Sequence, residues 1–327
     1  MFNTSQSKVN AWSKCRAFYS FRYVDFLKPK VKPRPLKFGS IIHSMIEADI
    51  KGKNPFKVLS DIAKKERNLF EAEREMYGEI VQDVKYIMTG YFDYWDGKPE
   101  ELEYLKIGKN SAEHLFEIEI AKGILAKGKI DASAKAKKLK WIVEHKSHKN
   151  FPKPEHRWRN LQSVLYGRIH EMMGWGKIDG TVWDYIRSKP PTRPAILKSG
   201  EMSRAALDSL PQVVEDIIKE NKLDRKKYLE VITAQADNRS NWYQRIFTPT
   251  SKTIIEPILA DFIATSQEMS RLHGKSRTKT FGRHCEWCTF EKLCAAQLQG
   301  HDVEYLMEKE FVKDEKDYHE DFVEITD

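Results

Sequence analysis

Two carboxylates and an amine occur close together in this chain, at Asp131, Glu144 and Lys146. The apolar runs on either side of a short polar break predict a β-hairpin at this place. If the hairpin turns between Lys137 and Lys138, Asp131 lies directly opposite Glu144. Lys146 then projects from the same face as Glu144, because side chains alternate along a strand. The sequence therefore predicts that the three groups converge on one patch.

Converging acids favour a bound cation. Two carboxylates repel each other unless a cation lies between them, and hard oxygen ligands suit Mg²⁺ or Mn²⁺. The alternative is a surface salt bridge on a charged hairpin, which contributes little to stability. Other acid-x-Lys triplets, at residues 49–51, 83–85 and 220–222, lie in stretches typical of solvated helices or loops. Glu144 differs because it ends a Trp-Ile-Val strand and faces an acid of the preceding strand.

The segment that follows the hairpin predicts an amphipathic helix. Apolar residues recur at helical spacing over residues 156–173. Gln162 and Tyr166 are four residues apart and share one face of this helix, with Arg159 one turn before Gln162. An amide and a phenol beside a carboxylate pair can orient a phosphate or a water molecule. The alternative is an ordinary helix with a half-buried tyrosine.

These motifs resemble those of the RecB-like branch of the PD-(D/E)XK nuclease superfamily. That branch carries a Gly-x-x-Asp segment, a Glu-x-Lys strand and a Gln-x-x-x-Tyr helix in this order. Here they correspond to residues 128–131, 144–146 and 162–166. The resemblance implies an α/β fold of the restriction-endonuclease type, with a mixed central sheet flanked by helices. We expect an added helical region at about residues 52–110.

The resemblance also implies the ligands and the reaction. The branch has a His after a Gly on an early helix, which is similar to His43 after Gly39. Hydrolysis of a phosphodiester bond is the expected reaction, with Lys146 positioning or deprotonating the attacking water. The expected ligands of one or two Mg²⁺ or Mn²⁺ ions are His43, Asp131, Glu144 and the carbonyl of His145. The expected catalytic residues are Asp131, Glu144, Lys146, Gln162 and Tyr166.

The chain has four cysteines, Cys15 near its start and Cys285, Cys288 and Cys294 near its end. A disulfide framework is not expected in a chain of 327 residues whose first residues do not read as a secretory signal peptide. Four thiolates suit a tetrahedral Zn²⁺ ion or an iron–sulfur cluster, and their spacing does not choose between these.

Resemblance to a known group of nucleases favours an iron–sulfur cluster over Zn²⁺. One group of RecB-like nucleases, which includes CRISPR-adaptation nucleases and the AddB nuclease domain, places one Cys before the nuclease core and Cys-x-x-Cys-x(5)-Cys after it. The order and local spacing here are the same, which implies a 4Fe-4S cluster on the four cysteines. We expect it to be a structural staple between the N- and C-terminal segments. Zn²⁺ and unligated thiols are the alternatives.

The net charge of +8 is unevenly distributed. Eleven acidic residues and three lysines occur from His301 onward, which leaves +16 on residues 1–300. A positive body implies a polyanionic partner. Basic residues, and an aromatic residue that can stack on an unpaired base, lie near the predicted site. We predict nucleic-acid contacts at Lys137, Lys138, Lys149, Arg157, Trp158 and Arg159.

The chain reads as one RecB-like nuclease domain over residues 1–300, followed by an acidic tail at 301–327. The tail is the predicted contact for a recombination or replication protein. No apolar run has membrane-spanning length, so we expect a cytoplasmic protein of a bacterium or phage without a membrane partner. The other predicted elements are strands at 116–120 and 181–186, helices at 203–222 and 252–272, and a cysteine segment at 281–297.

Together these features predict a metal-dependent DNA nuclease. We expect an exonuclease that acts on DNA ends or single strands in recombination, repair or replication. One alternative is a non-catalytic nucleic-acid-binding scaffold of the same fold. Another is a structure- or sequence-specific endonuclease, or an enzyme that acts on RNA. The chain has no phosphate-binding Gly loop of the helicase type, so an ATP-driven motor is not expected.

Overall fold

A mixed five-stranded sheet lies at the centre of the protein. The computed structural model describes residues 1–327 except 67–70, 154–156, 158–159, 206 and 315–327. In spatial order the strands are β3 (Glu103–Tyr104), β6 (Ala132–Ala136), β7 (Leu139–His148), β8 (Gly180–Arg187) and β9 (Tyr243–Pro249). β7 and β8 are parallel, whereas the other neighbouring strands are antiparallel. The predicted mixed sheet and the predicted strand at 181–186 are confirmed.

The hairpin of β6 and β7 has the register predicted from the sequence. Its innermost pair is Ala136 with Leu139, and the same register continues outward to Ala132 with Val143. The two turn residues, at 137 and 138, have φ of 52° and 65°. These left-handed values belong to a two-residue turn whose twist matches that of the strands. The predicted turn between the two lysines is confirmed.

A smaller three-stranded sheet adjoins the central one. Its strands, in spatial order, are β1 (Phe2–Thr4), β5 (Ile124–Ile130) and β4 (His114–Ala121). β5 is parallel to β1 and antiparallel to β4. Asp131 alone separates β5 from β6, so the chain passes from one sheet into the other at this residue.

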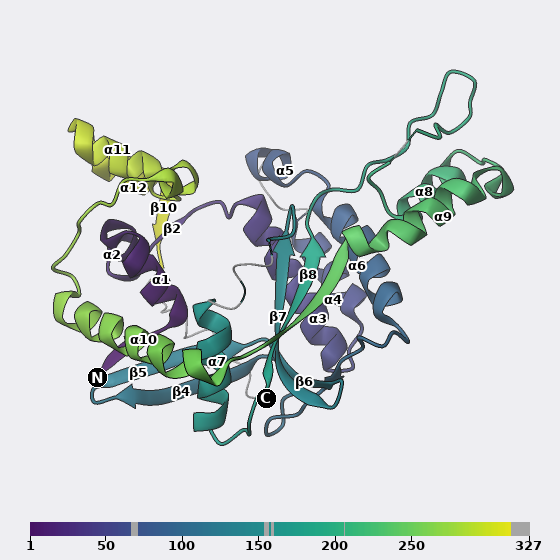
Figure 1. Cartoon of the computed structure of the whole chain (residues 1–327). Helices are drawn as coiled ribbons and strands as arrows, with labels where there is room; N and C mark the ends of the chain where they lie inside the picture. The colour runs from purple at the N-terminus through teal and green to yellow at the C-terminus, as the bar shows by residue number, and fades with distance from the viewer. Residues whose placement is uncertain (67–70, 154–156, 158–159, 206, 315–327) are drawn as a thin grey trace.

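Helices cover both faces of the central sheet (Figure 1). A large core forms between one face and the helices on it, around Phe38, Ile42 and Ile87. On this side lie α3 (Arg34–Ile50), α4 (Pro55–Glu66) and α6 (Ile80–Trp95), with α5 (Glu71–Tyr77) between α4 and α6 in the chain. On the other side lies α7 (Leu161–Met172), and α10 (Lys252–Leu272) and α1 (Gln6–Lys14) pack beside it over the smaller sheet. None of the described helices is long and apolar enough to cross a membrane.

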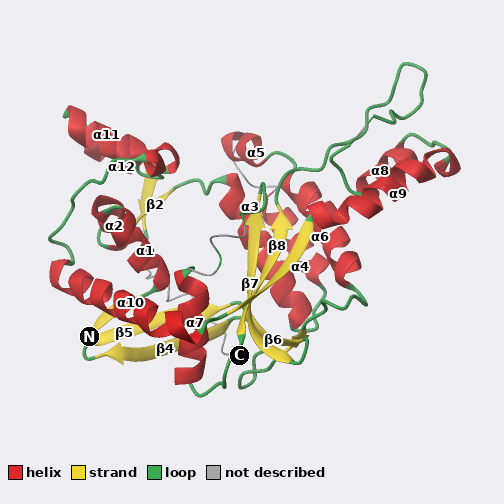
Figure 2. Cartoon of the chain, in the orientation of Figure 1, coloured by secondary structure: helices red, strands yellow, loops and turns green. Residues whose placement is uncertain are grey.

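The connection between β8 and β9 carries two further helices. A loop that precedes them projects away from the body of the molecule (Figure 2). The helices are α8 (Pro211–Glu220) and α9 (Leu229–Asp237), with 3₁₀ turns η2 (Arg225–Tyr228) and η3 (Asn238–Asn241). α8 begins at Pro211 and not at residue 203 as predicted, since proline has no N–H and suits the first turn of a helix. The predicted helix at 252–272 is confirmed as α10.

The C-terminal part of the chain returns to the N-terminal part. The three clustered cysteines lie on and between η4 (Arg283–Trp287) and α11 (Glu291–Gln299), and α12 (Val303–Glu310) follows. β10 (Phe311–Lys313) then pairs antiparallel with β2 (Leu27–Pro29), which lies between α2 (Arg16–Tyr23) and α3. The predicted acidic tail thus starts with a helix and a strand, and its residues 315–327 lie outside the described residues.

Gly128 allows an aromatic ring to lie across the smaller sheet. It pairs with Phe116 in the ladder of β4 and β5. A Cβ atom at residue 128 would lie 2.4 Å from the ring of Phe116. That ring packs edge-on against Tyr166 of α7, with the ring centroids 5.5 Å apart. The glycine of the Gly-x-x-Asp segment is therefore required by the packing of this sheet against α7.

Gly128→Ala should lower the free energy of unfolding by about 1–3 kcal/mol, because the added methyl group displaces the Phe116 ring. Gly167→Ala in α7 is the control, since a Cβ there would meet only Ile178 Cγ2, at 4.0 Å. The control should be neutral or stabilising by up to about 1 kcal/mol. Chemical denaturation measures both changes. Equal stability of Gly128→Ala and the wild type would contradict the packing explanation.

Candidate active site and metal centre

Asp131 is held from three directions at the joint between the two sheets. Its Oδ2 accepts the backbone N–H of His145 at 3.0 Å and lies 3.7 Å from Nδ1 of His43. Its backbone carbonyl accepts the N–H of Glu113 at 2.7 Å. Strand β7, helix α3 and the start of β4 therefore all fix the position of this carboxylate.

Glu144 and Lys146 lie on the face of β7 that α7 covers. Glu144 is only 3% exposed. Its Oε1 lies 2.5 Å from Nζ of Lys146 and accepts a hydrogen bond from Nε2 of Gln162 at 2.7 Å. Lys146 Nζ also donates to Oε1 of Gln162 at 3.3 Å. The structure thus brings these three predicted residues into a closed triangle of polar contacts.

Helix α7 delivers its polar face to this triangle. It begins at Leu161, where the Asn160 side chain caps it by accepting the N–H of Gln162 at 2.9 Å, and residues 156, 158 and 159 of the predicted segment lie outside the described residues. Tyr166 follows one turn after Gln162 and is 7% exposed, with Phe116 against its ring. Burial raises the pKa of Tyr166, so its phenol is protonated at neutral pH.

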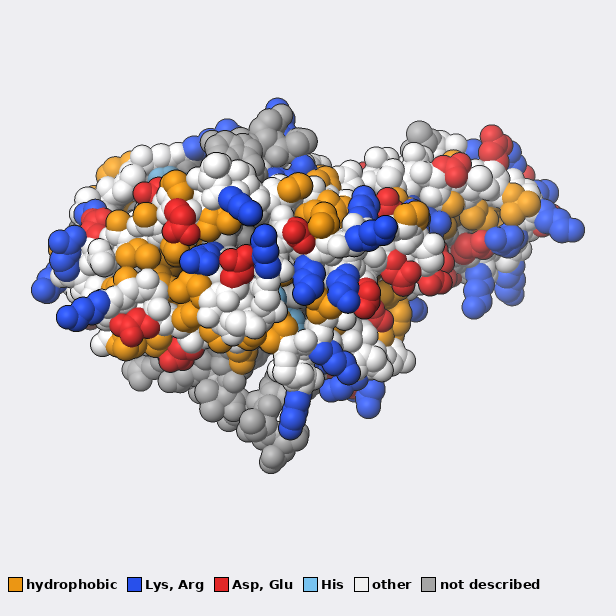
Figure 3. Space-filling view, turned by 60° about the horizontal axis from the view of Figure 1, so that its bottom comes forward, with side chains coloured by type: hydrophobic (Ala, Val, Ile, Leu, Met, Phe, Trp, Pro, Cys, Tyr) orange, Lys and Arg blue, Asp and Glu red, His pale blue; other side chains and the backbone are white. Residues whose placement is uncertain are grey.

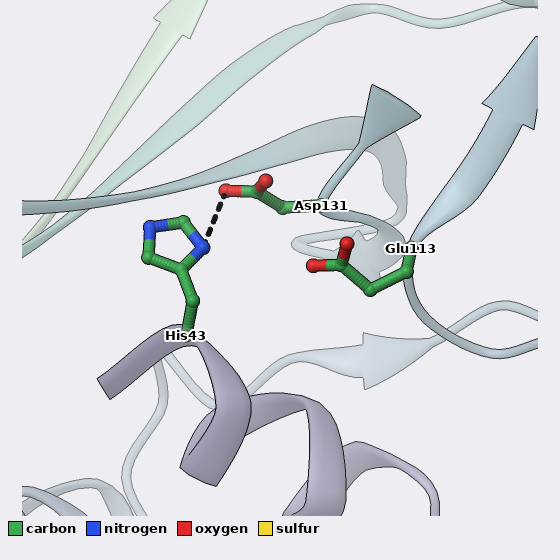
Figure 4. A group of neighbouring side chains, drawn as sticks. All are labelled: His43, Glu113 and Asp131. Atoms are coloured by element: carbon green, nitrogen blue, oxygen red, sulfur yellow. Dashed lines mark ion pairs between the residues drawn. The ribbon is translucent and has the colours of Figure 1, made fainter. Parts of the chain in front are cut away.

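His43, Glu113 and Asp131 form a group that suits a metal ion (Figure 4). One ligand atom from each of the three lies within 4.8 Å of the other two. Figure 4 shows the imidazole reaching from α3 toward the carboxylates, which come from the corner after β5 and from the residue before β4. Two oxygen donors and one nitrogen donor are a ligand set for a divalent cation.

Sequence reasoning missed Glu113. It precedes a strand whose next acid of the same parity, Glu117, is exposed, and it therefore looks like one more surface acid. In the structure His114 pairs with Ile130 in the β4–β5 ladder, and one further step in that register places Glu113 opposite Asp131. The register shifts between Glu119 and Ala121, next to the turn, so counting outward from the turn would not have given this pair.

The surroundings raise the pKa of both glutamates of the site and lower the pKa of Asp131. Burial, reinforced by Asp131, raises the pKa of Glu144 to about 7. Burial also raises the pKa of Glu113 to about 7, although the ion pair with Lys129 opposes the rise. Burial acts in the same direction on Asp131, but positive neighbours and the N–H of His145 outweigh it and lower the pKa of Asp131. Asp131 is therefore the acid that is ionised throughout the neutral range.

The two basic residues of the site also differ in their protonation state. Burial lowers the pKa of Lys146, but Glu144 and Asp131 outweigh this effect and raise it, so the amine is charged. Burial lowers the pKa of His43, which keeps the imidazole neutral at neutral pH. A neutral imidazole has a lone pair that can bind a metal.

The side chain of His145 points to the face of β7 opposite Glu144. Its Nδ1 lies 3.1 Å from Oδ2 of Asp184 on β8, and Nε of Arg245 on β9 lies 3.4 Å from the same oxygen. All three side chains are at most 5% exposed. The imidazole thus belongs to a buried polar row across three strands. The backbone N–H of His145, and not its side chain, donates to Asp131.

Three of the lysines that the sequence assigns to nucleic-acid contact are on the surface or near it. Lys137 and Lys138 form the turn of the β6–β7 hairpin, about 20 Å from Glu144 along β7. Lys149 is exposed just beyond the end of β7. Figure 3 shows Lys and Arg side chains gathered around the centre of one face of the molecule.

Arg157 does not belong to the exposed basic surface to which the sequence assigned it. Its side chain is 8% exposed, and its Nε donates to the hydroxyl of Tyr185 at 3.4 Å. Its guanidinium also lies over the Tyr185 ring, 5.4 Å from the centroid. Arg157 therefore supports a buried tyrosine of β8. The predicted contacts Trp158 and Arg159 lie outside the described residues.

The four cysteines line one cavity of about 140 Å³. Cys15 enters from the junction of α1 and α2, and the other three enter from the η4–α11 segment, 270 residues later in the chain. The wall also contains Phe18, Phe21 and Phe290. Burial raises the pKa of the Cys288 thiol. The structure thus brings together all four predicted ligands.

Comparison with known proteins identifies a family whose model matches the chain. A model of the PD-(D/E)XK nuclease superfamily matches residues 3–295, a stretch that contains all the site residues above and the four cysteines. No curated protein matches the chain. Among solved structures, a "putative exonuclease" from Eubacterium rectale has 11% identity and a TM-score of 0.47, with 89% of this chain and 87% of that chain covered. A structure named SSO0001 has 13% identity and a TM-score of 0.29, with 79% and 84% covered.

Glu144→Gln should stabilise the metal-free protein at about pH 8 and have little effect at about pH 5. A pKa of about 7 in the folded state means that the native protein holds this proton more tightly than the unfolded chain does. The resulting stability is present in full below the unfolded pKa and is lost as the pH rises through 7. The variant avoids that loss and should gain about 1–3 kcal/mol over the wild type at the higher pH.

Thermal unfolding in excess chelator at the two pH values measures this gain. Glu117→Gln is the matched control, because Glu117 is 57% exposed beside β5 and pairs with a lysine as an ordinary surface acid. It should show no pH-dependent difference from the wild type. A stabilisation of equal size at both pH values would mean that the buried charge of Glu144 is not its cause.

Proposed function

Because the chain belongs to the PD-(D/E)XK nuclease superfamily, we propose that it is a DNA exonuclease that requires Mg²⁺ or Mn²⁺. It acts on DNA ends or single strands in recombination, repair or replication. The observation that carries this proposal is the contact triangle of Glu144, Lys146 and Gln162 beside an ionised Asp131. A phosphodiester bond needs charge neutralisation and a positioned water to be hydrolysed, and these groups supply both.

The donors of the site fit a hard divalent cation. Carboxylate and carbonyl oxygens suit Mg²⁺ and Mn²⁺, and a neutral imidazole is compatible with Mn²⁺. When bound, the metal lowers the pKa of a water molecule and neutralises charge on the phosphate. In this proposal the residues that hold it are His43, Asp131, Glu144 and the backbone carbonyl of His145.

Lys146 is the proposed catalytic amine. Its ammonium group is charged and is aimed by two acceptors, Glu144 Oε1 and Gln162 Oε1. A charged amine held in this way can position the attacking water and stabilise the negative charge that develops on the phosphate. Gln162 has its amide oriented by both neighbours, and Tyr166, a protonated phenol beside it, is the proposed contact to the DNA strand or to water.

We assign the chain to the RecB-like branch on its motif set, with residues 1–300 as the nuclease domain. Residues 52–110, which include α4, α5 and α6, are the helical insertion of that domain. Lys137, Lys138 and Lys149 are the described part of the nucleic-acid surface. The acid-rich segment from residue 301 is the proposed contact for a partner protein of recombination or replication.

A 4Fe-4S cluster is the proposed occupant of the cysteine cavity. All four cysteines line this cavity of about 140 Å³, which has room for a group larger than one metal ion. Phe18, Phe21 and Phe290 form an apolar part of its wall. The ligands come from both ends of the domain, so the role proposed for the cluster is structural.

Digestion of end-labelled linear DNA and of circular DNA tests the proposed function. Linear DNA should be degraded with Mg²⁺ or Mn²⁺ and left intact in excess EDTA, and circular DNA should persist. Ca²⁺ should bind without supporting cleavage, because it activates water poorly. Cleavage of circular DNA would indicate an endonuclease. DNA binding without any metal-dependent cleavage would indicate a scaffold.

Lys146→Ala should abolish cleavage while DNA binding is largely retained, because affinity comes from the distributed basic surface and not from this amine. Lys64→Ala is the control: it removes one exposed lysine of α4, outside the proposed nucleic-acid surface, and it should keep the wild-type turnover number. Single-turnover digestion and filter binding separate the two effects. Wild-type turnover in Lys146→Ala would refute the site assignment.

Anaerobically purified protein should be brown and contain roughly four iron atoms per chain. Cys15→Ala should lose the iron and melt at a lower temperature, because the staple between the two ends of the domain is lost. Ser13→Ala, an exposed neighbour on α1, is the control and should keep both properties. A colourless protein with one Zn²⁺ per chain would keep the staple and overturn the iron assignment.

A further inference from the structure

Glu113 and Lys129 form an ion pair at the edge of the metal centre. We propose that Glu113 is an additional ligand of the divalent metal, and that Lys129 is the resident cation that holds Glu113 until the metal replaces it. This inference deepens the proposed function, because it rests on the metal centre described above. It adds a ligand outside the three motifs that led to that centre.

The backbone directs Glu113 into the centre. Its φ of 58° is left-handed, a conformation uncommon for glutamate, and it breaks the alternation that exposes Leu115 and Glu117 on β4. The N–H of Glu113 donates to the carbonyl of Asp131 at 2.7 Å. The two residues are thus tied by their backbones, and a carboxylate oxygen of each lies within 4.8 Å of the other and of a His43 nitrogen.

A neighbouring pair shows what an ordinary salt bridge looks like on the same two strands. Glu117 pairs with Lys127 at 3.0 Å, and the two residues are directly opposite in the ladder. Glu117 is 57% exposed, so its carboxylate is well hydrated, and among the described residues it belongs to no group of three potential metal ligands. Glu113, in contrast, is 13% exposed and lies within the His43 and Asp131 group.

The ammonium group of Lys129 can be displaced from Glu113. Its side chain is 46% exposed, so its ammonium group can move into water without opening the core. A flexible four-carbon stem and a single point charge make lysine a replaceable counter-ion rather than a fixed one. Lys146, the other lysine of the site, is held by two acceptors instead of one. When a divalent cation binds, Glu113 exchanges the Lys129 ammonium for the metal, and no covalent bond changes.

Isothermal titration of the metal-free protein with Mn²⁺ tests the exchange, with free Mn²⁺ counted by electron paramagnetic resonance. Glu113→Gln removes a ligand charge and should weaken Mn²⁺ binding by at least about tenfold. Lys129→Gln removes the competing cation and should strengthen binding by about two- to fivefold. The matched controls Glu117→Gln and Lys127→Gln should bind Mn²⁺ as the wild type does.

The opposite signs expected for the two variants separate this proposal from a purely structural ion pair. If the pair were only structural, both variants would melt at a lower temperature and neither would change the Mn²⁺ affinity. Unchanged affinity in a folded Glu113→Gln protein would overturn the ligand assignment, and weaker binding by Lys129→Gln would overturn the exchange. If Glu113→Gln does not fold, the sign for Lys129→Gln decides. Wild-type Mn²⁺ binding without DNA cleavage would refute the nuclease proposal and leave this inference standing.

Discussion

Three carboxylates are held near one another and largely away from water, and the rest of the structure compensates for the cost. Two unit charges about 4 Å apart interact by about 4 kcal/mol near a protein surface, and burial adds the loss of hydration. The fold offsets this cost locally, because each acid has a donor or cation of its own. The pairs are Glu113 with Lys129, Asp131 with the N–H of His145, and Glu144 with Lys146.

The need to hold these acids in place also explains why strand β7 carries buried polar side chains on both of its faces. Its one face must present a charged residue pair to α7, while its other face packs against the helices on the opposite side of the sheet. A row of three polar side chains on that other face, at His145, Asp184 and Arg245, joins β7 to β8 and β9. These buried contacts tie β7 to its two neighbouring strands and restrict its sideways movement. The strand that carries the acid and the amine is thereby fixed from behind.

How much could be predicted from the sequence depended on how far apart in the chain the contacting residues lie. The β6–β7 register follows from local information, since the turn lysines and the alternation lie within one hairpin. The role of His43, the nuclease assignment and the choice of a 4Fe-4S cluster came from resemblance to a known family, because spacing alone does not predict contacts between distant segments. Glu113 was missed because its role depends on a left-handed φ and on the β4–β5 register. Arg157 was misplaced because its partner Tyr185 lies on β8, distant in the sequence, and holds the guanidinium away from the surface.

The single residue between β5 and β6 has a consequence for how the protein acquires its activity. Glu113 belongs to the edge of the smaller sheet, Glu144 belongs to the central sheet, and Asp131 is the joint between them. A nascent chain that has formed only one of these sheets holds only part of the acidic set. The acidic set is therefore complete only when both sheets have formed and packed against each other, so the site is a product of the whole fold and of neither sheet alone.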